Sequence, residues 1–482
     1  MPQPGTGLEH KLAGEQQVFA PPLGSLVHRA PVICTEEIAV HEGARIMREQ
    51  EVGSVVVVDS QSRPVGILTE HDLVRVLADD RGSTPVAAVM TREPIALPAH
   101  ALAYEAALVM VENRVRHVLV TADGKLVGVV SERDLLSLQR LGLAELTMEI
   151  RLAADVELLA RLAAEIRRLT ALLVEQGVAA EQLTLFVSVL NDRLSQRVIE
   201  IVRKRHGWER IGWCWLAFGS EGRLEQTFSS DQDNGLLFES HAAASAAEAR
   251  DTLLGFAREV NEALDACGFP LCKGNVMASN PELCLSLDEW KAKMGGWLGN
   301  PDPRALLDAA ICFDFRPLSG DATLAEQLRE WLLARTRARP AFLRLMATNA
   351  LQARPALGML GDFATEDVRY INLKLHGVRP FIDAARIFAL AFGLAQTGTA
   401  QRLRAAAAEL RMAPPEMAAI VDAFFFIQKL RLRIQARPGV LSPESANRID
   451  PGTLNDFERR GLKEALRQAR KLQQRLALDY GL

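Results

Sequence analysis

The chain of 482 residues has 49% hydrophobic and 24% charged residues, the profile of an ordinary globular protein with length for about three domains. Its 56 basic and 60 acidic residues give a net charge of −4, which argues against a protein held on nucleic acid or on an anionic membrane by bulk charge. Six cysteines without a C-x-x-C pair indicate reduced thiols rather than a zinc site or a disulfide framework. The N-terminus lacks a signal peptide and no apolar run is long enough to cross a bilayer, so we expect a cytoplasmic protein that does not enter the membrane.

An internal repeat follows a Pro-, Gly- and Gln-rich lead-in, residues 1–25, that we expect to be flexible. Each copy has an alanine-rich helix that contains a methionine, then a β-branched strand, a polar turn and a closing peptide. The two closing peptides match position by position and read Gly66-Ile-Leu-Thr-Glu-His-Asp-Leu73 and Gly128-Val-Val-Ser-Glu-Arg-Asp-Leu135.

The closing peptide has the chemistry of a nucleotide site. Thr69 and Ser131 stand where a strand ends and a helix begins, so free N–H groups and the helix dipole favour a phosphate there. Asp72 and Asp134, three residues on, can accept hydrogen bonds from both hydroxyls of a ribose. The alternative is a plain capping box with an acidic first turn.

The repeat, about residues 30–138, resembles a pair of cystathionine-β-synthase (CBS) domains. The resemblance implies one pseudo-symmetric module with a cleft that takes an adenine nucleotide, AMP or ATP, although many such pairs hold no ligand. It also implies a homodimer, since CBS pairs commonly associate in that way.

Residues 141–206 change to a helical pattern. Apolar residues recur every three or four positions from Leu152 to Leu173, Gly177 suits a helix C-cap, and a second helix is expected from Ala180 to about Arg205. This hairpin is either a connector that carries a signal between modules or the first packing layer of the next domain.

The segment from Trp213 to Phe238 carries the strongest chemical signal. An apolar strand, Trp213–Phe218, stops at Gly219-Ser220, and a second strand is expected to begin at Asp231-Gln-Asp233. Alternation along that strand points both aspartates to one side, where a hard divalent cation relieves their repulsion. Gly219 allows close approach of a triphosphate to the backbone.

The joint pattern G-S-x-x-R-x-E-x-x-x-x-S-D-x-D resembles the active-site signature of DNA polymerase β-like nucleotidyltransferases, and especially the PII-protein uridylyltransferase branch and the nucleotidyltransferase-like proteins that carry CBS pairs. The resemblance runs from about residue 145 to the C-terminus. It implies Mg²⁺ (or Mn²⁺) and a nucleoside triphosphate donor. The residues it assigns to the metal are Asp231 and Asp233, and those it assigns to the nucleotide are Gly219, Ser220 and Arg223.

That family has a third carboxylate on a later strand. We expect a buried strand over Ala309–Arg316 with a single acid, Asp314, which would ligate metal or deprotonate the incoming hydroxyl. The alternative is an ion pair between Asp314 and Arg316 or another arginine. Asp308 and Asp321 are the reserve candidates.

Two further segments are candidates for the nucleotide cleft. Lys273, Gly274 and Asn275 either line it or form a loop that satisfies only its own backbone. Beyond Pro340 the pattern is helical and resembles the substrate-binding region of the same family. The cations there that could face phosphates are Lys374, His376 and Arg386. For Lys374, contact with phosphate and no functional role are equally favoured. For His376, a capping or core role is favoured.

The sequence thus predicts an α/β and α+β multidomain protein with a flexible segment at 1–25, a CBS pair at 26–140, a helical connector at 141–206, a nucleotidyltransferase core at 207–335 and a helical substrate-binding domain at 336–482. We expect metal-dependent transfer of a nucleoside monophosphate to a hydroxyl, on a protein acceptor, as in uridylyl- or adenylyltransferases, with regulation by adenine nucleotide at the CBS pair. The alternative is a non-catalytic nucleotide sensor. Addition of nucleotides to RNA is disfavoured by the net charge and by the absence of a basic stacking platform.

Overall fold

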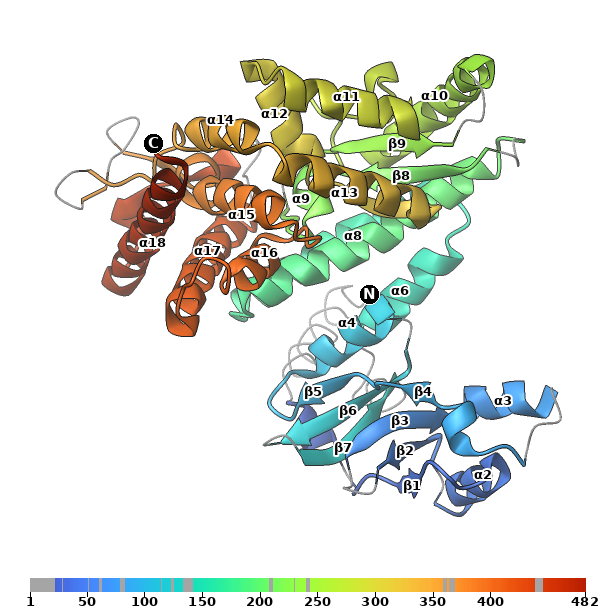
Figure 1. The fold of residues 1–482 in the computed structure, drawn as a ribbon. Coiled ribbons are helices and arrows are strands. Elements are labelled where there is room, and N and C mark those ends of the chain that lie inside the picture. The colour runs from blue at the N-terminus through green and yellow to red at the C-terminus, as the bar shows by residue number, and fades with distance from the viewer. Residues whose placement is uncertain are drawn as a thin grey trace, which may run out of the picture. The chain divides into compact units, whose positions relative to one another are not determined.

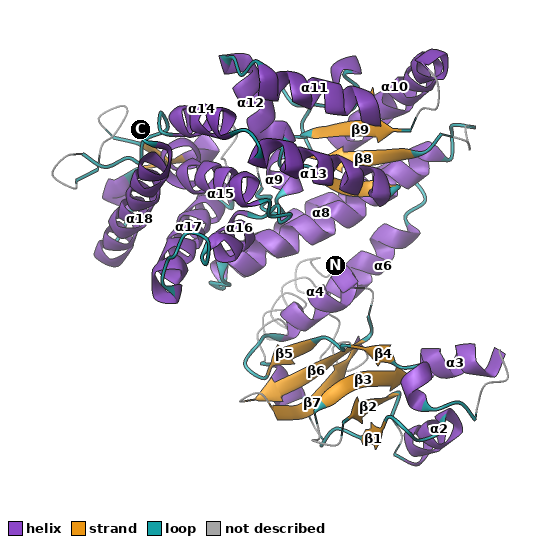
Figure 2. Ribbon diagram, in the orientation of Figure 1, coloured by secondary structure: helices purple, strands orange, loops and turns teal. Residues whose placement is uncertain are grey.

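The computed structural model describes residues 22–27, 29–50, 52–59, 63–78, 83–113, 115–122, 125–132, 142–207, 211–228, 230–239, 243–358, 362–363, 369–437 and 445–482. The chain forms two compact units, residues 1–148 and 149–482, each with sheets and helices of its own (Figures 1 and 2). None of the described helices is both long enough and apolar enough to span a bilayer.

The first unit contains one small sheet for each repeat. The first repeat has the strand order β1-β2-β3-β4, and the second has β5-β6-β7. In both, a parallel pair is followed by an antiparallel pair, and a helix lies between the first and second strands in the chain. The elements are η1 (Leu23–Leu26), β1 (Ile33–Thr35), α2 (Val40–Glu49), β2 (Ser54–Val58), β3 (Pro64–Thr69), α3 (Glu70–Ala78), η2 (Val86–Ala88), β4 (Thr91–Arg92), β5 (Ala96–Pro98), α4 (Ala103–Asn113), β6 (His117–Ala122) and β7 (Lys125–Ser131), with α6 (Gly142–Leu152) at the boundary of the units.

The sequence pattern explains this repeat. All five residues of β2 are buried, and β-branched valines suit a strand that is covered on both faces. Val55 and Val57 pack with Val40 and Met47 of α2, while Val56 packs with Leu119 of the second repeat. The predicted internal repeat and its elements are therefore present.

The second unit is built on a mixed sheet of order β10-β9-β8-β11. β8 (Trp213–Ala217) is antiparallel to β9 (Asn234–Phe238) and to β11 (Arg316–Gly320), and β10 (Cys284–Ser286) is parallel to β9. Side-chain alternation along β8 serves two layers. Trp215 meets Phe256 of α10 (Ala243–Ala266) on one face, whereas Leu216 joins a core with Trp290 of α11 (Leu287–Gly299) on the other.

Further helices complete this core and the C-terminal region. They are α9 (Gly219–Gly222), α11 (Leu287–Gly299), α12 (Pro303–Cys312), α13 (Ala322–Arg337), α14 (Pro340–Ala350), α15 (Arg379–Phe392), α16 (Thr399–Ala406), α17 (Pro414–Gln435) and α18 (Asp456–Tyr480). The short elements are η3 (Pro281–Leu283), β12 (Ile371–Asn372), the π-helical turn η4 (Lys374–Val378), η5 (Ser445–Asn447), β13 (Arg448–Ile449) and η6 (Pro451–Thr453).

The predicted strand over 309–316 is wrong. The Asp302 side chain caps the helix that follows, Pro303 occupies its first turn, and α12 continues to Cys312. Its buried residues, which are Ala305, Leu306, Ala309 and Cys312, recur at helical spacing. The strand begins only at Arg316, so Asp314 lies in the link between α12 and β11.

The helical hairpin after the first unit is α7 (Val156–Glu175) and α8 (Ala180–Arg203), with Gly177 at a left-handed φ of 79° between them. Both helices belong to the second unit. The side chain of Gln196 in α8 donates to the carbonyl of Leu318 in β11 (2.8 Å), and Ser188 accepts from the backbone N–H of Gln226 (3.1 Å). These contacts favour the packing-layer alternative over a free connector.

Candidate functional site

Three separate segments meet at one end of the sheet in the second unit. In the strand register, Ala217 at the end of β8 lies opposite Asn234 of β9 on one side and Arg316 of β11 on the other. The turn after β8, the aspartate before β9 and the link before β11 therefore share one edge. Strand pairing thus brings together Gly219, Asp233 and Asp314, residues up to 95 positions apart in the chain.

The turn at this edge requires its glycines. Gly219 has a φ of 54°, and a Cβ there would lie 2.7 Å from Oδ2 of Asp233. A Cβ on Gly222 would meet the carbonyl oxygen of Asp314 at 1.9 Å. The G-S-x-G turn therefore packs its backbone directly against both acidic segments. The close approach of a triphosphate to Gly219 stays a prediction. Ser220, half-buried, lies in the same turn.

Asp231 and Asp233 lie immediately before β9, which begins three residues later than expected, at Asn234. Alternation still holds, because Asp231 is exposed, Gln232 is buried and Asp233 is half-buried. Burial raises the pKa of Asp233 to about 7, and the charge of Asp231 adds to the increase, while Cys272, Lys374 and Arg223 oppose it.

These two carboxylates have the character of a cation site. The raised pKa of Asp233 reflects a carboxylate taken partly out of water beside a second acid, and a divalent cation relieves both costs. In the described part of the chain no group of three or more His, Cys, Asp or Glu side chains is placed to hold a metal. Mg²⁺ commonly binds through one or two carboxylates and completes its shell with water and substrate phosphates, so an aspartate pair fits it.

Asp314 is not available as a third ligand, and the assignment of Asp314 to the metal is wrong for this structure. Its side chain is fully buried, and its oxygens accept hydrogen bonds from three guanidinium groups. The donors are Arg223 at 2.8 Å, Arg386 at 2.7 and 3.0 Å and Arg402 at 2.5 Å. Burial by itself raises the pKa of Asp314, but Arg386, Arg402 and Arg223 outweigh it and hold the pKa far below its usual range. The alternative of an ion pair with arginine is therefore the one that the structure shows for Asp314, and its partners are the three arginines above instead of Arg316.

Two of these three arginines, Arg223 and Arg386, were candidates for contact with nucleotide phosphates. Arg223 binds both Asp314 and Glu225, whose carboxylate is 2.9 Å away, so it holds the turn and is corrected from a direct phosphate ligand to a positioning role. Arg386 is buried between Asp314 and Asp383 and does not face phosphates. The cluster ties the turn of the core to α15 and α16 of the C-terminal region.

Lys374 is placed differently from these arginines. It is exposed at the start of η4, and its charge lowers the pKa of Asp233, as does that of Arg223. His376, two residues on, has its Nδ1 2.8 Å from the carbonyl oxygen of Arg354, in agreement with the capping or core role. Lys374 is thus an exposed cation whose field reaches the aspartate pair.

The loop at 270–280 borders the same site. The thiol of Cys272 donates to Oδ1 of Asp233 at 3.4 Å, a contact that the sequence did not predict. Lys273 and Gly274 are exposed beside it, and Asn275 adopts a left-handed φ of 54°. The loop position favours the cleft-lining alternative for these residues.

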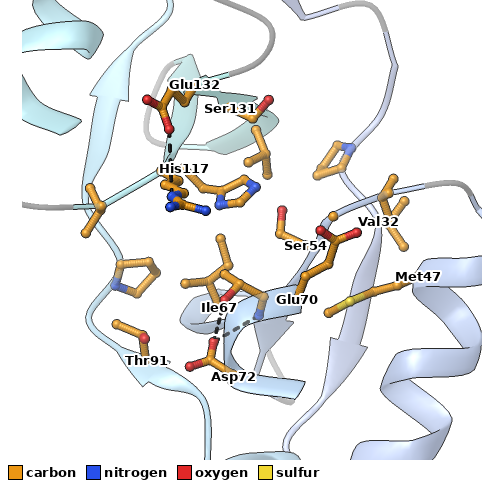
Figure 3. A pocket seen from close by; sticks show the side chains of 18 of the residues that line it. Val32, Met47, Ser54, Ile67, Glu70, Asp72, Thr91, His117, Ser131 and Glu132 are labelled. Carbon is orange, nitrogen blue, oxygen red and sulfur yellow. Dashed lines mark hydrogen bonds and ion pairs between the residues drawn. The ribbon is translucent and has the colours of Figure 1, made fainter. Parts of the chain in front are cut away.

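The first unit holds a second candidate site, a cavity of about 1360 Å³ lined by both repeats. Thr69, Asp72 and Ser131 are among its lining residues, and Figure 3 shows Asp72 and Ser131 on opposite sides of it. Asp134 lies outside the described residues. The lining mixes apolar side chains such as Val32 and Ile67 with charged ones. Its arginines are Arg29, Arg48 and Arg116, and its acids are Glu70, Asp72, Glu93 and Glu132.

Asp72 forms the capping interaction that was the alternative to a nucleotide role. Its Oδ2 accepts from the backbone N–H of Thr69 (3.0 Å) and from the Thr69 hydroxyl (2.7 Å), and Arg75 donates to its other oxygen at 3.3 Å. The same carboxylate nevertheless lines the cavity. Capping and ligand binding are thus compatible at this position.

Two linked repeats around a cavity, and a mixed sheet with a glycine turn beside paired aspartates, define the class: a regulatory-type repeat module joined to a nucleotidyltransferase-type core. Comparison with known families agrees. Residues 23–79 and 86–140 each match the CBS domain, residues 164–304 match the family described as Putative nucleotidyltransferase DUF294, and residues 340–480 match its Putative nucleotidyltransferase substrate binding domain. The chain therefore combines a CBS pair with a domain of the family described as Putative nucleotidyltransferase DUF294 and with the substrate binding domain of that family, which confirms the predicted multidomain fold class.

The matches to individual relatives cover only about a fifth to a quarter of this chain. The chain is 37% identical over 99 residues to an uncharacterized 17.7 kDa protein of Acidianus ambivalens, which is 20% of this chain and 60% of that protein. It is 33% identical over 108 residues to the mitochondrial CBS domain-containing protein CBSX3 of Arabidopsis thaliana, 21% of this chain and 52% of that protein. Among solved structures, the CBS domain protein PAE2072 from Pyrobaculum aerophilum complexed with AMP is 30% identical, covering 26% of this chain and 98% of that one with a TM-score of 0.24.

Sequence reasoning missed the residues that support the site from later segments. Arg402 and Cys272 had no motif that linked them to the acids they contact. Gln232 and Asn234 could have been assigned to the inner face, because they alternate with the aspartates. Their partner Asn261, on α10, could not have been found without the tertiary structure.

Proposed function

We propose that this protein transfers a nucleoside monophosphate from a nucleoside triphosphate to a hydroxyl acceptor on a protein, with a divalent cation at Asp231 and Asp233. The single observation that carries the proposal is the aspartate pair beside the Gly219 turn. The two are so close that a Cβ on Gly219 would lie only 2.7 Å from Oδ2 of Asp233. In the reaction the acceptor oxygen bonds to the α-phosphorus, pyrophosphate leaves, and the hydroxyl proton is released.

Each residue of the site then has a defined task. Asp231 and Asp233 would hold Mg²⁺ or Mn²⁺, which supplies charge neutralisation on the reacting phosphates when bound. The backbone of Gly219 and Ser220 would pack against the triphosphate, and Lys374 would neutralise part of its charge from the C-terminal region. Arg223 and Asp314 would keep the turn in place without touching the substrate.

The cavity of the first unit would bind an adenine nucleotide and regulate the transferase. Its apolar lining suits a base, Asp72 suits the ribose hydroxyls and the peptide at Thr69 suits a phosphate. The second closing peptide, with Ser131 and Asp134, would act in the same way. Dimerisation through the CBS pair would accompany this regulation.

The test uses nucleoside triphosphates labelled at the α- or the γ-phosphate, with Mg²⁺, in a cell extract. We expect label from one α-labelled donor, UTP or ATP, to appear on a protein, and no label from the γ-labelled form. The Asp233→Asn variant is the matched control and should transfer none. Label from the γ-phosphate would instead show phosphoryl transfer.

The competing function is a non-catalytic nucleotide sensor, and the engagement of Asp314 by three arginines is the observation that favours it. A sensor would bind nucleoside triphosphate yet transfer no label from any donor. The same labelling experiment, with nucleotide binding measured on the purified protein, separates the two functions.

A further inference from the structure

A buried network of three side-chain amides lies directly behind the aspartate pair. Its members are Gln232 and Asn234, which flank Asp233 in the chain, and Asn261 of α10. All three are nearly inaccessible to solvent, at 3%, 1% and 1% exposure. Because side chains alternate here, the inward amides of Gln232 and Asn234 belong to the same stretch of backbone as the outward carboxylates of Asp231 and Asp233.

Asn261 is the centre of this network. Its Nδ2 donates to Oε1 of Gln232 at 2.7 Å and to Oδ1 of Asn234 at 3.0 Å, which uses both of its hydrogens. Its backbone carbonyl accepts from Nε2 of Gln232 at 2.9 Å. Gln232 is thereby bonded to α10 through both ends of its amide group.

The network also holds the loop that borders the site. Oδ1 of Asn261 accepts from the N–H of Ser279 (3.1 Å), and Oδ1 of Asn234 accepts from the N–H of Ala278 (2.8 Å). Gln232 bonds the other end of the loop, since its backbone N–H donates to the carbonyl of Pro270 at 3.0 Å. The aspartate segment and the loop that carries Cys272 are thus bonded to each other directly, and Asn261 bonds to both of them.

Packing alone does not require such a network. Three buried amides are stable only because each finds partners, and apolar residues would fill the same space without that demand. What the amides add is direction, since each donor and acceptor position is fixed by the others. A site for a small cation depends on such direction, because its carboxylate ligands must be held within a few tenths of an ångström.

We propose that Asn261 is a positioning residue that sets the orientation of Asp231 and Asp233, and hence their affinity for a divalent cation. The proposal rests on the transferase function argued above and adds to it a residue outside the motif. Asn261 touches neither metal nor substrate. It acts through Gln232 and Asn234.

The test variant is Asn261→Asp, which keeps the size of the side chain and its bond to Ser279. It removes both N–H donors and turns a carboxylate oxygen toward the oxygens of Gln232 and Asn234. The control is Val260→Ala, a neighbouring and fully buried position on α10 that takes no part in the network. Asn261→Ser, which retains one hydroxyl donor without adding charge, keeps the test valid if Asn261→Asp does not fold.

Three quantities are measured on the full chain: binding of Mn²⁺ without nucleotide, the Mg²⁺ concentration for half-maximal turnover, and hydrogen exchange of the Ala278 amide. Asn261→Asp should raise the dissociation constant for Mn²⁺ and the Mg²⁺ concentration for half-maximal turnover at least tenfold. It should also accelerate hydrogen exchange of the Ala278 amide at least tenfold. Asn261→Ser should show smaller changes of the same kind. Val260→Ala should lower the melting temperature yet leave all three within twofold.

Equal effects of Asn261→Asp and Val260→Ala on metal dependence would overturn the proposal, because they would show a merely structural role. If the unmodified chain neither binds Mn²⁺ nor turns over, the proposed function fails. The exchange rate at Ala278 then decides by itself whether Asn261 fixes the loop and the aspartate segment, and an unchanged rate overturns that role as well.

Discussion

Asp233 and Asp314 lie at the same end of one sheet and against the same glycine turn, yet their surroundings are opposite. Asp233 has a second carboxylate as its neighbour, and burial raises its pKa to about 7. Asp314 is surrounded by three guanidinium groups that hold its pKa far below the usual range. The difference teaches that the neighbours of a carboxylate, rather than its place in a motif, decide between a cation site and an ion-pair centre.

The largest expected effect is the loss of turnover in Asp233→Asn. Removing one of two metal ligands should lower the transfer rate at least about a thousandfold, which corresponds to about 4 kcal/mol of barrier. Without metal, the Asp233→Asn variant should be at least as thermally stable as the unmodified chain, because a partly buried carboxylate that repels Asp231 is removed. Asp251→Asn, an exposed change on α10, is the control. Normal turnover in Asp233→Asn would contradict the assignment of the site.

Asp314→Asn should have the reverse profile. Among the described residues, Asp314 is the carboxylate that Arg402 binds, and Arg223 and Arg386 share it. Its removal leaves these buried cations poorly compensated. We expect the free energy of unfolding to fall by about 3–5 kcal/mol, measured by denaturant titration. Turnover well below the melting temperature should fall far less than in Asp233→Asn. A stable variant without turnover would return Asp314 to the catalytic site.

The pH dependence of stability sharpens the contrast further. Because the folded pKa of Asp233, about 7, lies above the ordinary value of 3.8, its contribution is fully present below about pH 4 and is lost as pH rises toward 7. In EDTA we expect the ionisation of Asp233 to lower the free energy of unfolding by roughly 2–4 kcal/mol from pH 5 to 8, a range where Asp314 stays ionised.

Asp233→Asn should remove the share of Asp233 from the pH dependence, and Mg²⁺ should reduce that share in the unmodified chain. Glu221, whose pKa burial and Asp192 raise to about 8, leaves a dependence of the same sign that is at least as large over this range. A pH profile identical in the two proteins would show that Asp233 is not the titrating group.

In the first unit, Asp72→Ala should weaken the binding of AMP or ATP about tenfold through lost hydrogen bonds to the ribose. It should also cost about 1 kcal/mol of stability, because the bonds to Thr69 cap α3. Titration calorimetry and thermal melting separate the two effects. Glu93→Gln, a change at another acid of the cavity wall, is the control and should leave affinity within twofold.

The smallest effect is expected for Lys374→Gln. An exposed lysine beside Asp233 contributes by charge and not by fixed geometry, so the KM for nucleoside triphosphate should rise several-fold with little change in kcat. Lys273→Gln, on the loop across the site, gives the comparison. An unchanged KM in Lys374→Gln would remove the C-terminal region from nucleotide binding.

Much of the fold could be predicted because its signals are local. The repeat, the β2 valines and the helices α7 and α8 follow from residue types at fixed spacing. The predicted strand over 309–316 was wrong because the prediction used only the local pattern. Its apolar residues fit a strand or a helix, and the cap at Asp302 with Pro303 lay just upstream of the segment considered.

The sequence alone determined the two-module architecture, the glycine turn and the outward pair Asp231 and Asp233, because alternation along a strand and the steric freedom of glycine act over a few residues. The tertiary structure decided which side chains from remote helices contact Asp314 and the aspartate segment. Arg386 and Arg402 reach Asp314 from helices 72 and 88 residues away, and Asn261 reaches the aspartate segment from α10. Electrostatic and hydrogen-bond energies depend on distance in space, and only the packing of remote helices sets those distances.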